Sequence, residues 1–87
     1  MSKFGLIQSE LFFWRSVRTQ RTPAEMASAI EIGFWDLVPG IFARTGSSSA
    51  VGTVAMELRQ LARLVRASRD RQDARSAIEK YRGLRHA

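Results

Sequence analysis

The chain has 87 residues, which is one domain at most, and a domain of this size buries only a modest share of its surface. It has no cysteine, so disulfides are excluded, and its single histidine, His86, leaves little from which to build a metal site. Oligomerisation is the remaining common source of stability for a small domain, so we expect a homo-oligomer or a subunit of a larger complex.

Basic residues outnumber acidic ones by 14 to 8, a net charge of +6, and the excess lies in the second half. Residues 1–44 carry five basic and four acidic groups, whereas residues 45–87 carry nine and four. Twelve of the basic residues are arginine, which binds phosphate and carboxylate groups in a bidentate manner. The charge points to nucleic acid, an anionic membrane or an acidic protein as partner, and a merely solvated arginine-rich face is the alternative.

Uncharged segments are short. The longest are Leu37–Ala43 and Thr45–Met56, well below the roughly 20 apolar residues that span a bilayer. Glu10 interrupts the apolar residues that follow Lys3, which argues against a signal peptide. We therefore expect an intracellular, cytoplasmic protein with no transmembrane segment.

The first expected helix spans residues 3–18, where Phe4, Ile7, Leu11 and Trp14 recur on one face, which Leu6, Phe13 and Val17 widen. The second spans residues 23–38 and starts with a capping box, Thr22-Pro23-Ala24-Glu25, with proline at the first helical position. Pro39-Gly40 is expected to end it, because proline disfavours a helical conformation in the preceding residue. Residues 39–49 are then a connector containing a Ser-rich and Gly-containing turn.

The third expected helix spans residues 50–68, with an apolar seam at Val51, Val54, Leu58, Leu61 and Val65. The fourth spans residues 71–82, and its apolar face is out of phase with that seam. Either a new helix is capped by Asp70 or one long helix bends there. Residues 83–87 are expected to be a frayed tail. No segment alternates with the period of a strand. The sequence thus predicts a single all-α domain over 1–87, a compact bundle of three to four helices.

Catalytic motifs are missing. No nucleophile, base and orienting group occur at a recognisable spacing, and no metal-ligand set is present. The segment from Gly40 to Ser48 fails as a phosphate loop, because its second glycine comes six residues after the first and no lysine follows. Ser47–Ser49 precede a helix N-terminus near Arg44, and ordinary capping is favoured there over anion binding. We expect no enzymatic activity, no cofactor and no bound metal.

Arginines on the third helix form one candidate site. Arg59, Arg63 and Arg66 fall on one side of that helix, and three more arginines extend the positive field. Such a ridge suits the phosphate backbone of nucleic acid, although a solvated face is the alternative. A helix-turn-helix over Thr22–Phe42 fits poorly, because Pro39-Gly40 falls within its second helix. The candidate nucleic-acid-binding residues are Arg59, Arg63, Arg66, Arg69, Arg71 and Arg75.

Aromatic residues form a second candidate site, since seven of the eight lie in the first half of the chain. Phe12 and Phe13 are adjacent, as are Phe34 and Trp35, so some of them are expected to be exposed and to form an interface. The alternative is that all are core. Binding to a membrane surface by residues 34–42 is disfavoured by Asp36 and by the lack of a basic flank. The candidate protein-interface residues are Phe12, Phe13, Trp14, Phe34, Trp35 and Phe42.

Two functions follow from these surfaces. The leading hypothesis is a nucleic-acid-associated accessory or regulatory protein that contacts phosphate groups through the arginine ridge. The alternative is a protein-binding adaptor or inhibitor that uses the aromatic first half, as small phage and mobile-element proteins do; that comparison rests on size and composition only. The expected partners are accordingly nucleic acid or an acidic protein.

Overall fold

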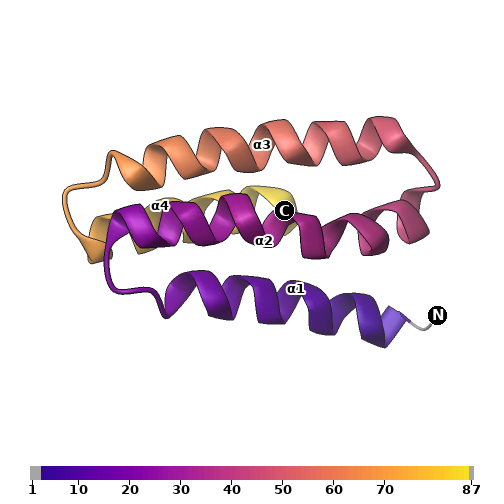
Figure 1. Ribbon diagram of the computed structural model, residues 1–87, viewed down its shortest axis with the longest axis horizontal. Coiled ribbons are helices and arrows are strands. Elements are labelled where there is room, and N and C mark those ends of the chain that lie inside the picture. The colour runs from indigo at the N-terminus through magenta and orange to yellow at the C-terminus, as the bar shows by residue number, and fades with distance from the viewer. Residues whose placement is uncertain (1–2, 87) are drawn as a thin grey trace.

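The computed structural model of the protein is a bundle of four helices (Figure 1). It describes the backbone of residues 3–86 and the side chains of residues 10–83. The helices are α1 (Lys3–Arg18), α2 (Pro23–Thr45), α3 (Ser48–Arg66) and α4 (Arg71–His86), and no strand occurs in this part of the chain. The predicted all-α bundle is confirmed.

The helices form a ring in chain order. α2 lies between α1 and α3, and α4 lies behind α2 in the view of Figure 1. The α1–α2 and α3–α4 turns lie at one end of the bundle, on the left in Figure 1, and the α2–α3 turn lies at the other. The face of α2 that points away from α4 therefore has α1 on one side and α3 on the other.

The predicted end of the second helix is wrong. α2 continues through Pro39 and ends at Gly46, whose φ is 64° and whose N–H donates to the carbonyl of Phe42 at 2.7 Å. Pro39 lies on the exposed side of α2, so the backbone bond to Trp35 that it removes is lost at the surface. Ile41 is only 6% exposed and extends the buried stripe beyond the proline, which holds the extra turns against the core. The expected connector over 39–49 reduces to residues 46–47.

α3 and α4 are two separate helices and not one long bent helix. The side chain of Asp70 accepts the N–H of Asp73 at 2.8 Å, and the side chain of Asp73 accepts the N–H of Arg69 at 3.2 Å. These two hydrogen bonds cap the N-terminus of α4. Capping of a new helix by Asp70 was one of the two expectations from the sequence. α4 then runs through Gly83 to His86, so the predicted end of the helix at residue 82 is wrong, while fraying of the C-terminal residues stays a prediction.

Val17, Met26, Ile30, Val65 and Ile78, which come from all four helices, are the largest fully buried side chains. The predicted stripe of α1 is partly wrong. Leu11, which was predicted for the buried face, is 54% exposed, whereas Phe13, Trp14 and Val17, which were also predicted for it, are buried. The side chains of Phe4 and Ile7 lie outside the described residues.

α2 is long and apolar enough to cross a membrane by length and composition alone, which its uncharged runs did not indicate. Its apolar stretch is 33% buried within the bundle, and core helices of water-soluble proteins meet the same criterion. The lack of a transmembrane segment therefore stays a prediction.

Candidate binding surfaces

The bundle divides the six aromatic residues of the predicted interface into two groups. Phe13, Trp14 and Phe34 are 5%, 8% and 8% exposed, so these three are core residues and cannot form a surface. The other three are at least half exposed: Phe12 (65%), Trp35 (71%) and Phe42 (50%). Phe12 and Trp35 are the exposed members of the two adjacent pairs.

Local packing explains why Phe13 and Trp14 point inward. The Phe13 ring lies against the backbone at Gly33, where the lack of a side chain lets α1 approach α2 closely. Phe13 and Trp14 meet edge to face at 4.7 Å, and Trp14 lies 6.0 Å from the Tyr81 ring. The Arg82 guanidinium carbon lies 5.4 Å from the centroid of Trp14, a cation–π distance. Trp14 thus links α1 to α4.

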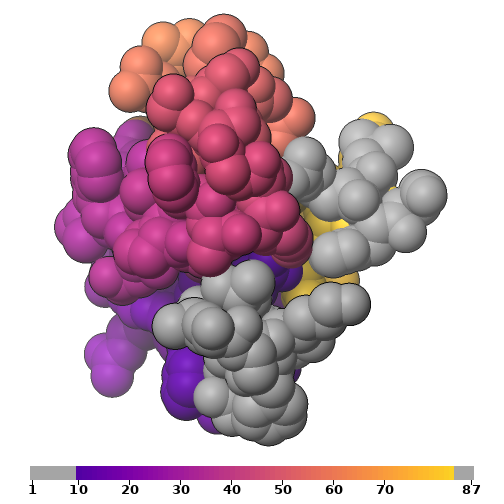
Figure 2. Space-filling view, turned by 90° about the vertical axis from the view of Figure 1, so that its right-hand side faces the viewer, coloured from indigo at the N-terminus to yellow at the C-terminus, as the bar shows by residue number. Residues whose placement is uncertain are grey.

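The exposed aromatics share one side of the molecule. Ile32, Trp35, Pro39 and Phe42 recur at i, i+3, i+7 and i+10 of α2, and all four are exposed. Phe12 joins them from α1, because Ser16, one turn further on, lines the same hollow as Ile32. We call these five residues the α2 face. Side chains of α2 project from the left-hand side of the molecule in Figure 2, between α3 above and α1 below.

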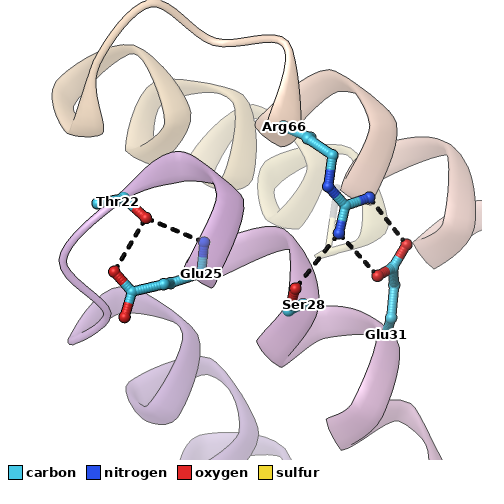
Figure 3. A network of polar contacts seen from close by, with 5 residues as sticks. All are labelled: Thr22, Glu25, Ser28, Glu31 and Arg66. Carbon is cyan, nitrogen blue, oxygen red and sulfur yellow. Dashed lines mark hydrogen bonds and ion pairs between the residues drawn. The ribbon is translucent and has the colours of Figure 1, made fainter.

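Three of the predicted arginines adjoin this face. The Arg66 guanidinium donates to both carboxylate oxygens of Glu31, at 3.1 and 2.9 Å, and approaches the Ser28 hydroxyl at 3.4 Å (Figure 3). Glu31 lies one turn before Trp35, so Arg59, Arg63 and Arg66 run alongside the α2 face. We call them the arginine flank. α3 thereby supplies the basic flank that the local sequence around residues 34–42 lacks.

Electrostatics tie Glu31 to this flank. The hydrogen bond from Arg66 lowers the pKa of Glu31 against the opposing effect of burial, and the positive charges of Arg66 and Arg59 add to the lowering. Glu31 also raises the pKa of Arg66, mainly through the same hydrogen bond. Arg66 is therefore partly neutralised, and Arg59 and Arg63 are the exposed members of the flank without an ion pair among residues 10–83.

The other three predicted arginines lie elsewhere, at the end of the bundle that holds the α1–α2 and α3–α4 turns (Figure 1). Arg71 donates to the backbone carbonyl of Arg18 at 2.8 Å, which brings α4 to the end of α1. Arg75 follows one turn after Arg71, and Arg69 lies in the α3–α4 turn. Arg21, in the α1–α2 turn, completes a group that we call the basic end: Arg18, Arg21, Arg69, Arg71 and Arg75.

Two members of the basic end, Arg18 and Arg21, were not predicted. Nothing in their local sequence marks them, because they are far in the chain from the other three. Only the pairing of the two turns brings them together. The predicted ridge of six arginines is thus divided between two surfaces.

Acidic residues near the basic end are used in helix capping. Glu25 accepts a hydrogen bond from the Thr22 hydroxyl at 3.0 Å, and the same hydroxyl accepts the N–H of Glu25 at 3.1 Å (Figure 3). Asp70 and Asp73 cap α4 as described above. Within residues 10–83 no ion pair joins these three carboxylates to the basic end.

The helix N-terminus at Ser47 and the groove between α3 and α4 are weaker candidate sites. The Ser47 hydroxyl accepts the N–H of Ala50 at 3.3 Å, which is ordinary capping, and Arg44 pairs with Glu10 at 3.1 Å. An open groove of about 960 Å³ lies between α3 and α4, over Leu61 and Leu64. No three acidic, histidine or cysteine side chains within residues 10–83 come close enough to hold a metal, and the side chain of His86 lies outside that range.

No family model matches the chain, and no curated protein or solved structure is similar to it. Two surfaces that the fold creates are the candidate functional sites. These are the basic end, and the α2 face with its arginine flank.

Proposed function

We propose that this protein is a nucleic-acid-associated accessory protein that contacts the phosphate backbone through its basic end. The observation that carries the proposal is the gathering of five arginines from two segments of the chain, residues 18–21 and 69–75, at one end of the bundle. They outnumber the three carboxylates nearby, Glu25, Asp70 and Asp73, which accept capping hydrogen bonds. Arginine binds phosphate oxygens in a bidentate manner and keeps its charge at any physiological pH.

The proposed binding is sequence-independent. The basic end consists of two turns and the helix ends beside them, so it offers no helix that enters a groove to read bases. Contacts of this kind release counterions and weaken steeply with salt.

The test is fluorescence anisotropy with labelled single- and double-stranded DNA and RNA of arbitrary sequence, at two salt concentrations of roughly 50 and 200 mM. The key variant is Arg21→Ala/Arg69→Ala, and Arg59→Ala/Arg63→Ala is its matched control because it removes the same charge from the arginine flank. All proteins are measured at a concentration at which they are monomers by sedimentation, so that self-association through the flank cannot affect the comparison. We expect the first variant to weaken binding and to reduce the log–log salt slope by about 2, roughly one unit for each arginine that no longer neutralises a phosphate. The control is expected to change both much less.

A lack of binding to every probe at low salt would refute the proposal. A larger loss in the Arg59/Arg63 control would move the site to the arginine flank and overturn the assignment to the basic end.

A protein-binding role is the second candidate, and the exposed side chains of Ile32, Trp35 and Phe42 favour it. Tryptophan and arginine are enriched at the energetic centres of protein interfaces, and here they lie next to each other. This role predicts an interaction that survives moderate salt and is abolished in Trp35→Ala. The Arg21→Ala/Arg69→Ala variant should retain it.

A further inference from the structure

We infer that the α2 face is the contact surface of a parallel homodimer, in which the α2 helices of two copies pack against each other and run in the same direction. This goes beyond nucleic-acid binding and uses a different surface. The reasons are the size of the apolar surface and the distribution of charge on its two sides.

The exposed apolar area suits a dimer. Phe12, Ile32, Trp35 and Phe42 are each between 50% and 72% exposed. With typical buried areas of about 150–250 Å² per large side chain, they offer roughly 500 Å² per copy. A stable interface buries about 800 Å² per partner, and the polar rim around the face supplies the remainder. Two-fold dimers are also the commonest oligomers.

The charged residues on the two sides of the α2 face favour a second copy of the chain as its partner. The face has the positive arginine flank on the side of α3, while Asp36 is exposed on its other side, toward α1. The α1 side also carries Arg15, at i+3 from Phe12. Around residues 34–38, however, Arg59 and Arg63 lie on one side and Asp36 on the other, and this part of the face complements a second copy of itself. An anionic membrane, by contrast, would attract the arginines but repel Asp36, which lies next to Trp35.

The positions of the charged residues also favour a parallel over an antiparallel arrangement of the two α2 helices. The Arg66–Glu31 pair sets the register of α3 against α2, which places Arg59 and Arg63 level with residues 34–38. A two-fold axis parallel to α2 brings these arginines opposite Asp36 of the other copy. An axis perpendicular to α2 within the interface instead brings arginine flank against arginine flank. The parallel arrangement therefore pairs opposite charges at contact distance.

The parallel dimer places both basic ends at the same end of the assembly. The repulsion between them acts through solvent and is screened over about 8 Å at physiological ionic strength, whereas the flank contacts are direct. A nucleic-acid backbone that spans both ends would relieve the repulsion and contact twice as many arginines.

Sedimentation equilibrium over a wide range of protein concentration tests the dimer. We expect twice the chain mass at high concentration, and a monomer in Trp35→Ala. Leu64→Ala is the matched control, because Leu64 is similarly exposed (63%) but lines the α3–α4 groove, and this variant should still dimerise. Arg21→Ala/Arg69→Ala should dimerise as well, so the dimer and the nucleic-acid site can fail independently.

Cysteine cross-linking tests the direction, since the chain contains no native cysteine. Ser28→Cys and Ala43→Cys lie near the two ends of the α2 face. In the parallel dimer each variant cross-links with itself. In an antiparallel dimer centred on residues 35–36, equivalent positions would be about 22 Å apart along the axis. Cross-links would then form only when the two variants are mixed.

Two results would overturn the inference. One is the mixed-only pattern of cross-links, which would show an antiparallel dimer. The other is a protein that remains a monomer at every concentration. If that monomer also bound vesicles of phosphatidylglycerol and phosphatidylcholine through Trp35, the α2 face would be assigned to a lipid surface.

Discussion

Gly33 lies where α1 comes closest to α2. A methyl group at this position would lie 2.8 and 2.9 Å from Cδ1 and Cε1 of Phe13, whose ring is held in the core by Trp14. Gly52, also inside a helix, has nothing within 4 Å of the equivalent point. The two glycines therefore separate the packing effect of a methyl group from its effect on helix propensity.

We expect Gly52→Ala to stabilise the protein by about 0.5–1 kcal/mol, because alanine is the better helix former. Gly33→Ala gains the same propensity but crowds the core, which costs about 1–3 kcal/mol, so it should be less stable than Gly52→Ala by that amount. Urea unfolding followed by circular dichroism measures both. Equal stabilisation by the two substitutions would contradict the close packing of Phe13.

Glu31 should make stability depend on pH. Its pKa is lowered from the ordinary value of 4.5, chiefly by the hydrogen bond from Arg66, so the folded state binds the proton less readily than the unfolded chain. The stabilisation is fully present above about pH 4.5 and is lost as the pH falls through the lowered pKa. Glu31→Gln should therefore lower the urea midpoint at neutral pH and leave it unchanged near pH 2, where both chains are uncharged at this position. A difference between the two proteins that persists at low pH would exclude the ion pair as its source.

At the scale of the element, α2 is the helix that determines the shape of the molecule. It contacts α1 and α3 along its length, and its residues Ile30, Phe34, Leu37 and Ile41 reach the core on one side. Its opposite side carries the α2 face. Pro39 lies on that opposite side, so the helix tolerates the proline without losing a buried hydrogen bond.

Replacement of Pro39 by alanine should restore the backbone hydrogen bond to Trp35 and stabilise the isolated chain by about 1–3 kcal/mol. Thermal unfolding at a low protein concentration, at which the chain is a monomer, measures the gain. A lower melting temperature in Pro39→Ala would mean that the proline ring makes a stabilising contact that outweighs the missing bond.

At the scale of the whole molecule, the core depends on α4 closing the ring behind α2. Ile78 is fully buried, whereas Leu64, an isomeric side chain on α3, is 63% exposed. Ile78→Ala should cost about 2–5 kcal/mol, a large part of the total for a domain of this size, and Leu64→Ala less than about 0.5 kcal/mol. Urea unfolding compares them. A similar decrease in the free energy of unfolding in the two variants would show that Ile78 of α4 is not part of the core.

Local sequence determined which segments are helical and where most of the helices begin, but it left open whether α3 and α4 are one bent helix or two. Hydrophobic periodicity and the capping box at Thr22 act within a few residues, so they are legible without a fold. The adjacency of Phe12 and Phe13, and of Phe34 and Trp35, likewise predicted that some of these aromatic side chains would be exposed. The end of α2 was missed, because Pro39 is unfavourable locally and is overruled by the burial of Ile41.

The tertiary structure alone decided which side of each helix is covered. Leu11 and Leu64 continue apolar patterns in the sequence but lie where no neighbouring helix covers them. The sequence predicted one continuous ridge of six arginines. In the structure, the turn before α4 places Arg71 and Arg75 near the end of α1, whereas Arg66 forms an ion pair with Glu31 of α2. A helix fixes the angles between its own side chains, but only the placement of its neighbours decides which of them meet solvent, and the two surfaces of this protein arise from that placement.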